Sequence, residues 1–162
     1  MVQIRAARSV PVNPPGAAFI LKHTQLWTAL QRKVRHATEF VPLMKSCTVL
    51  KDEGDVVLRD AILVQENGAV REMREEVTSY SQQWIIFRQT DGSTTTNLIS
   101  NSPQEGDEGL ILSYIFEWNY PDLKEESREY DEIVAATEKM ALTAVEKSIE
   151  VSRSMVTEGK IQ

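Results

Sequence analysis

The run DLKEESREYDEIVAATEKMALTAVEKSIEVSRSMVTEG, from Asp122 to Gly159, decides the fold that this sequence predicts. Asp122 is a good helix N-cap, Glu125 three residues later completes a capping-box pattern, and Gly159 stands where a helix C-cap is expected. No proline or glycine interrupts the residues between these ends. We therefore predict one helix of roughly 35 residues, ~50 Å long at ~1.5 Å per residue.

The predicted helix has one apolar face and one charged face. Residues alternating four and three apart form the face that should be buried, namely Tyr130, Val134, Thr137, Ala141, Ala144, Ser148, Val151 and Met155. Small side chains make up the middle of this face, and they either let a sheet approach closely or leave space for a ligand. A long helix needs an apolar surface to lie on, so the preceding residues should supply a sheet.

Ahead of this helix, the pattern is first that of one strand and two short helices. Residues 2–12 predict a strand that ends at the run Asn13-Pro14-Pro15-Gly16. Residues 24–36 predict a helix, and residues 39–44 predict a second short helical turn closed by Pro42.

The pattern then changes to a period of two, which is typical of strands. Six further strands are predicted, over residues 45–52, 55–65, 69–80, 83–90, 93–101 and 109–119. The short Gly-containing separators between most of them predict antiparallel hairpins. We therefore expect an α+β fold in which a curved seven-stranded antiparallel sheet surrounds the long C-terminal helix, with two short helices after strand 1. This arrangement leaves room for a ligand pocket at the end where the short helices lie.

Length, composition and charge exclude several classes of protein. The chain has 162 residues and a net charge of −6, without a cluster of basic residues, so we expect a single domain over residues 1–162 and no nucleic-acid partner. No signal-peptide pattern or membrane-spanning stretch is present, and we expect a cytoplasmic protein that does not insert into a membrane. Cys47 is the only cysteine, and His23 and His36 lack zinc-ligand spacing. We expect no metal and no cofactor, and a homodimer is compatible with the sequence.

Seven short motifs follow one another along the chain: Val12-Asn13-Pro14-Pro15, Thr24-Gln25-Leu26-Trp27, Phe40-Val41-Pro42, Leu58-Arg59-Asp60, Arg74-Glu75-Glu76-Val77-Thr78, Thr95-Thr96-Asn97 and Tyr130-Asp131-Glu132. Their order and spacing resemble the AtaL-like family of the START-like, helix-grip (SRPBCC) superfamily, which includes aromatase/cyclases. The resemblance covers essentially the whole chain and implies the helix-grip fold with a hydrophobic cavity. It also implies a role in secondary metabolism, with ligand carriage, polyketide cyclisation and isomerisation among the superfamily's activities. It implies no catalytic residue, because no catalytic motif is shared across the AtaL-like group.

Period two sorts strand residues into inward and outward sets, and a slip of one residue inverts the assignment. In the last predicted strand, the more apolar set should face inward, and it consists of Leu110, Leu112, Tyr114, Phe116 and Trp118. A two-residue turn at Asp91-Gly92 would pair Ile86 with Asn97. If Trp84 and Ile86 face inward, Arg88 and Asn97 do so as well.

Arg59 lies in a strand whose two faces are both apolar. The apolar count favours an inward set that contains Asp60, while the family resemblance favours the alternate set that contains Arg59. A three-residue loop with a bulge before the next strand puts Glu75 opposite Arg59, and a two-residue turn puts Glu76 there. A buried Arg–Glu pair would be a functional candidate, whereas a surface pair would contribute only about 0–1 kcal/mol.

Four residues are our candidates for acid–base chemistry: Tyr114, Asn97, Arg59 and Glu75. A phenol and a neutral amide can hydrogen-bond a carbonyl or enol in an apolar cavity, or they can simply satisfy neighbouring groups. The candidates for ligand contact are Phe40, Trp84, Ile86, Arg88, Phe116, Trp118, Tyr130, Val134, Thr137 and Ala141.

These expectations leave three hypotheses for function. The first is an enzyme that binds a small hydrophobic metabolite, derived from a polyketide or a peptide, and promotes cyclisation, dehydration or isomerisation. The second is a non-catalytic carrier of such a metabolite. The third is an interaction module whose interior is filled by side chains. An inward position of Arg59 and its glutamate partner favours the first hypothesis over the second.

Overall fold

The computed structural model describes all 162 residues, from Met1 to Gln162. The strands are β1 (Val2–Pro11), β2 (Met44–Asp52), β3 (Val56–Val64), β4 (Val70–Tyr80), β5 (Trp84–Gln89), β6 (Thr94–Asn101) and β7 (Leu110–Tyr120). The helices are α1 (His23–Arg35) and α2 (Arg128–Thr157), with single 3-10 turns at Ala37–Glu39 and Asp107–Gly109. None of the helices combines the length and the apolarity needed to cross a membrane.

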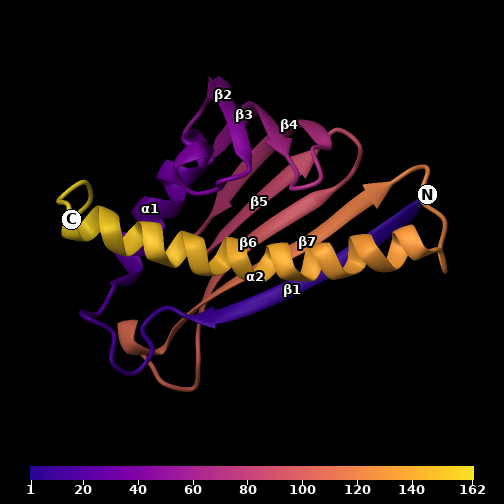
Figure 1. Cartoon of the computed structure of the whole chain (residues 1–162). Coiled ribbons are helices and arrows are strands. Elements are labelled where there is room, and N and C mark those ends of the chain that lie inside the picture. The colour runs from indigo at the N-terminus through magenta and orange to yellow at the C-terminus, as the bar shows by residue number, and fades with distance from the viewer.

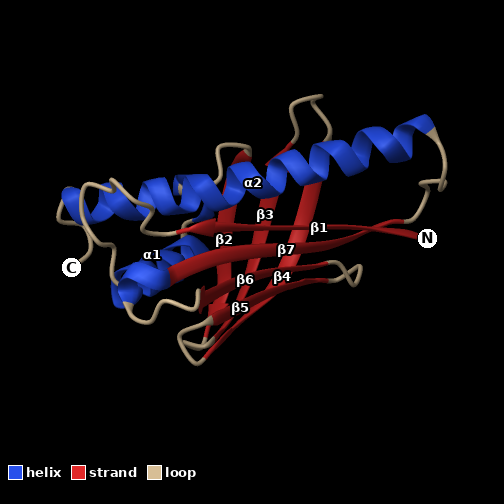
Figure 2. Cartoon of the chain, turned by 90° about the horizontal axis from the view of Figure 1, so that it is seen from below, coloured by secondary structure: helices blue, strands red, loops and turns tan.

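All seven strands form one antiparallel sheet in the order β1-β7-β6-β5-β4-β3-β2. The sheet curves around α2, which runs along β1 and β7, while α1 lies near the C-terminal end of α2 (Figures 1 and 2). The predicted helix-grip fold is therefore confirmed. Every strand, and α1, begins and ends within one residue of its predicted range. Glycine-containing turns mark most of the strand ends.

The start of α2 differs from the prediction. The helix begins at Arg128 and has 30 residues, and its N-cap is Ser127, whose Oγ accepts a hydrogen bond from the Tyr130 backbone N–H at 3.1 Å. Asp122 is therefore not the cap. Glu126 has a φ of 60°, which is incompatible with a helix running through it. Leu123 instead packs against Val2 and Ile4 of β1, so this segment crosses the sheet edge before the helix starts.

Two other local predictions are settled by the structure. Gly159 follows the C-cap residue of α2 with a φ of 71°, as expected for a glycine that ends a helix. The short helical turn predicted over residues 39–44 is wrong, because the 3-10 turn occupies Ala37–Glu39 and β2 already begins at Met44.

The buried side of α2 is lined largely by small side chains. Its fully buried residues are Thr137, Ala141, Val145, Ser148, Ile149, Ser152 and Met155. Four of these belong to the predicted inner stripe, and the stripe is wider than predicted because Val145, Ile149 and Ser152 also pack inward. Together with α1 and the inner face of the sheet, this side of α2 encloses the main hydrophobic core.

The hairpin between β5 and β6 corrects the predicted facing of β5. Its loop has three residues, because the Gln89 backbone N–H bonds the Ser93 carbonyl across Thr90-Asp91-Gly92. Asn97 therefore lies opposite Ile85 instead of Ile86. Ile85, Phe87 and Gln89 are buried, while Trp84, Ile86 and Arg88 lie on the outer face of the sheet, and Trp84 is 46% exposed. The prediction that Trp84, Ile86 and Arg88 contact a ligand inside the sheet is thus wrong, because one extra loop residue inverts the strand.

Candidate functional site

The interior holds a chain of polar side chains centred on Tyr114, which β7 points into the core. Tyr114 is 1% exposed. Its hydroxyl donates a hydrogen bond to Ser148 Oγ of α2 at 2.5 Å and accepts one from Lys33 Nζ of α1 at 2.9 Å. Burial raises the pKa of the Tyr114 phenol, although the bond to Ser148 works against this rise. The phenol therefore stays protonated and serves as a hydrogen-bond donor.

Arg59 of β3 and Glu75 of β4 form a buried ion pair beside this chain. The register places the two residues opposite each other, as the three-residue-loop alternative predicts, and the facing agrees with the family resemblance. Arg59 Nε and Nη2 lie 2.8 and 2.7 Å from Glu75 Oε2. Arg59 Nη1 also donates to the Val34 carbonyl at 2.7 Å, in the last turn of α1. The guanidinium is thus held by a carboxylate and by the negative end of a helix.

Lys33 of α1 is the buried basic group whose pKa is shifted most. It is 6% exposed, and its Nζ lies 4.1 Å from the centroid of the Tyr114 ring and 5.5 Å from that of Phe87. The pKa of Lys33 is lowered to about 7, chiefly by burial and secondly by repulsion from Arg59, while attraction to Glu75 opposes both effects. Its amine is therefore poised to gain or lose a proton near neutral pH.

Asn97 of β6 is buried without hydrogen bonds. It is 1% exposed and lies opposite Tyr114 in the pairing of β6 with β7. Neither its amide nitrogen nor its amide oxygen has a partner within the protein. Most buried side-chain polar groups are hydrogen-bonded, and an orphaned one costs about 1–3 kcal/mol. An unpaired amide on the strand position opposite Tyr114 is therefore a candidate point for a ligand to bind.

The four residues predicted for acid–base chemistry all face the interior. Arg59 and Glu75 pair with each other, and Asn97 and Tyr114 are neighbours on adjacent strands. Their catalytic roles stay predictions.

The residues predicted to contact a ligand are divided among several places. Phe116 and Trp118 continue the inner face of β7 beyond Tyr114, with Phe116 and Trp118 ring centroids 5.8 Å apart, and Thr137 and Ala141 are buried on α2. Apart from the three that lie on the outer face of β5, the remaining candidates belong to two smaller clusters. Tyr130 and Val134 pack around Leu123, and Phe40 packs with Ala29, Met155 and Ile161.

Sequence reasoning missed Lys33 as a site residue. The helical spacing contained the signal, because Lys33 stands three residues after Leu30 and four before Ala37, both of which are buried. A lysine at such a position either extends its amine to solvent or brings it into the core. The sequence alone does not choose between these outcomes, and the contact of the amine with Tyr114 of β7 decides for the second.

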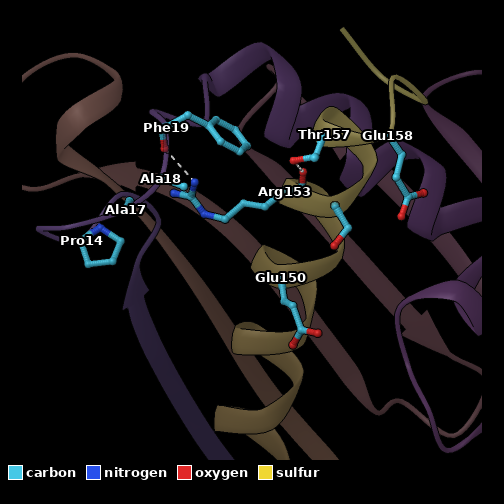
Figure 3. A pocket seen from close by; sticks show the side chains of 9 residues that line it. Pro14, Ala17, Ala18, Phe19, Glu150, Arg153, Thr157 and Glu158 are labelled. Carbon is cyan, nitrogen blue, oxygen red and sulfur yellow. Dashed lines mark hydrogen bonds between the residues drawn. The ribbon is translucent and has the colours of Figure 1, made fainter.

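Two pockets lie away from this polar chain. One, an open hollow of about 450 Å³, lies between Pro14, Ala17–Phe19 and the last turns of α2, where Arg153 donates to the Phe19 carbonyl and lies over the Phe19 ring (Figure 3). The second, of about 460 Å³, lies on the outer face of β1 and β7 and includes Ala7 and Ile115. No predicted site residue lines either pocket, so the cavity expected beneath α2 stays a prediction. No three His, Cys, Asp or Glu side chains gather as metal ligands.

Comparison with solved structures places the fold in a known class. The di-domain ARO/CYC StfQ from the steffimycin biosynthetic pathway matches 96% of this chain and 52% of its own, with 13% identity and a TM-score of 0.69. The ZhuI aromatase/cyclase from Streptomyces sp. R1128 matches 96% of this chain and 95% of its own, with 12% identity and a TM-score of 0.64. A START superfamily protein from Mycobacterium smegmatis matches 91% and 97%, with 11% identity and a TM-score of 0.64.

These likenesses define a START-like, helix-grip fold. Residues 6–159 match the family described as "Acetylaranotin biosynthesis cluster protein L" (AtaL), and the chain belongs to that family. The chain spans about half the length of the di-domain aromatase/cyclases. No curated protein matches it, and none of the likenesses supports a homodimer.

Proposed function

We propose that this protein binds a small, largely apolar metabolite on the inner face of its sheet and promotes cyclisation, dehydration or isomerisation with its own side chains. The metabolite would be a polyketide- or peptide-derived intermediate of secondary metabolism. The family description, which refers to a biosynthesis cluster, and the aromatase/cyclases among the structural neighbours support this proposal.

The observation that carries the proposal is the unpaired, buried Asn97 amide on the strand position opposite Tyr114. Apart from the polar chain, the surrounding interior is apolar, with Phe87, Phe116 and Ile99 among its buried residues. A ligand with a carbonyl or enol oxygen at this point would supply the missing partner of Asn97. The rest of the ligand would contact apolar side chains.

The arrangement supports acid–base chemistry at that oxygen. A ketone oxygen held by the Asn97 amide, and by the Tyr114 hydroxyl once that hydroxyl turns away from Ser148, would be polarised, so the neighbouring carbon becomes more acidic. Lys33, with its lowered pKa, takes the proton from that carbon and returns it later in the reaction. Arg59 and Glu75 hold the end of α1 and thereby position Lys33.

A non-catalytic carrier is the second candidate, and one observation favours it. Arg59 and Glu75 direct their polar contacts to each other and to backbone carbonyls of α1, which is how a purely structural pair behaves. In a carrier, Asn97 and Tyr114 would bind the same ligand oxygen without transferring a proton.

Denaturing mass spectrometry of small molecules released from protein purified from its own host tests the proposal. We expect an apolar metabolite that identifies the pathway, and we expect the wild-type protein to convert the pathway's precursor. Tyr114→Phe should retain binding and lose about 10²-fold or more in rate, because it removes one positioned donor.

Tyr80→Phe is the matched control, since Tyr80 lies on β4 and is 43% exposed. It should convert the precursor at the wild-type rate. Binding without turnover in every variant would favour the carrier. Equal turnover by Tyr114→Phe and the wild type would remove Tyr114 from the mechanism.

A further inference from the structure

The buried polar chain carries one more basic group than acidic groups. Lys33 and Arg59 are both basic, and Glu75 is the only carboxylate among the groups that face Lys33. The other groups around Lys33 are neutral: Tyr114 of β7, which bonds Ser148 of α2 in turn, and the Phe87 ring of β5.

The single carboxylate is already occupied. Glu75 Oε2 receives both Nε and Nη2 of Arg59, and no carboxylate lies within 4.0 Å of the Lys33 amine. A buried ammonium without a counter-ion is strongly disfavoured, so the unliganded protein lowers the cost by releasing the proton. A bound anion would remove the need for this release.

The hydrogen-bonding capacity of the site fits such an anion. An ammonium has three N–H donors, and Lys33 uses one of them on the Tyr114 oxygen. The Asn97 amide nitrogen has two N–H donors and no acceptor within the protein. Free donors thus come from Asn97 of β6, which lies opposite Tyr114 in the sheet, and from Lys33 of α1, which bonds the Tyr114 hydroxyl.

We propose that the ligand of this protein has an acidic head group, a carboxylate or the enolate of a 1,3-dicarbonyl compound, which the Lys33 ammonium and the Asn97 amide bind as an anion. This inference rests on the proposed function and specifies its substrate class. An acidic ligand transfers its own proton: the O–H or C–H bond breaks, its electron pair stays on the ligand, and the proton goes to Nζ. A ligand that arrives ionised draws that proton from solvent, so binding takes up a proton above neutral pH.

Two fluorescent probes that differ mainly in charge test the inference. They are 8-anilinonaphthalene-1-sulfonate, whose sulfonate stays ionised throughout the titration, and neutral N-phenyl-1-naphthylamine. At about pH 6 we expect Lys33→Met to weaken binding of the sulfonate at least about tenfold, because a charge-assisted bond is lost, and to leave binding of the neutral probe unchanged. Lys139→Met, which removes an exposed lysine of α2, should leave both affinities at wild-type values.

The wild-type protein supplies a second measurement that needs no variant. Sulfonate affinity should fall as the pH rises from about 6 to about 9, while the affinity for the neutral probe stays constant, because only the first depends on the Lys33 proton. If both probes bind and neither pH nor Lys33→Met separates them, the inference is overturned and the proposed function stands. If neither probe binds in the interior, the proposed function fails together with the inference.

Discussion

Lys33 places a basic nitrogen among aromatic rings, and this one residue makes the interior sensitive to pH. Its ammonium form has no carboxylate of its own, while its neutral form still donates a hydrogen bond to Tyr114. The balance between the two forms is therefore set by burial and by the neighbouring Arg59.

Stability should rise with pH through the titration of Lys33. The pKa is lowered from 10.5 to about 7, so between these values the unfolded chain binds a proton that the folded chain does not. The free energy of unfolding then increases with pH by at most about 1.4 kcal/mol per pH unit, and the destabilising effect is fully present below about pH 7. Urea unfolding at a series of pH values measures this slope.

Lys33→Met is the variant that isolates this residue, since methionine keeps an unbranched apolar stem without the charge. We expect it to be more stable than the wild type at about pH 6 and to lose the rise toward pH 10. Lys139→Met should follow the wild-type profile. Parallel profiles for the wild type and Lys33→Met would show that the amine titrates as it does in water.

At the residue scale, the sequence predicts contacts that a local turn determines and misses contacts that depend on distant strands. The partner of Arg59 could be narrowed to Glu75 or Glu76, and the three-residue loop that the structure contains selects Glu75. The facing of β5 could not be predicted, because its two alternate sets of residues are equally apolar. One set contains Trp84 and Ile86, and the other contains Ile85 and Phe87. One loop residue at Thr90 decides between them. Lys33 was missed because its burial depends on partners from distant strands.

At the scale of elements, the β3–β4 hairpin carries two Arg–carboxylate pairs that differ mainly in location. Arg59 and Glu75 lie on the inner face, where their side chains are 4% and 5% exposed. Arg74 and Asp60, one position away on each strand, form a bidentate pair on the outer face. The hairpin therefore offers its own internal control for the effect of burial.

Glu75→Gln should lower the free energy of unfolding by about 3–5 kcal/mol, because it leaves the Arg59 charge buried without a counter-ion. Asp60→Asn should leave the urea midpoint nearly unchanged, since water solvates Arg74 when its partner is neutral. Equal midpoints for the two variants would mean that the inner pair is solvated in solution.

The start of α2 provides a second prediction at this scale. Ser127→Ala should lower the free energy of unfolding by about 1 kcal/mol, because the Tyr130 N–H loses its acceptor. Asp122→Ala should have almost no effect, because residue 122 precedes the helix. Thermal unfolding followed by circular dichroism compares the two, and a larger loss for Asp122→Ala would place the helix start where the sequence pattern alone had put it.

At the scale of the whole molecule, alternating patterns and mostly glycine-containing turns are sufficient to predict the meander of the six later strands and the long helix, but not the pairing of β1 with β7. They do so because each hairpin is local and each turn has its own residue chemistry. The space beneath the helix is not predictable in the same way. Whether small residues such as Ala141 leave a void or admit a neighbour depends on side chains that distant strands contribute.

The pairing of the first strand with the last has a consequence for how the protein is made. Val2 pairs with Tyr120, and Val10 pairs with Leu112. On the ribosome, β1 therefore emerges first and stays without its partner until β7 has been translated. The nascent chain must keep this half-buried strand from pairing wrongly during that interval, so we expect chaperones to be needed most before β7 has emerged.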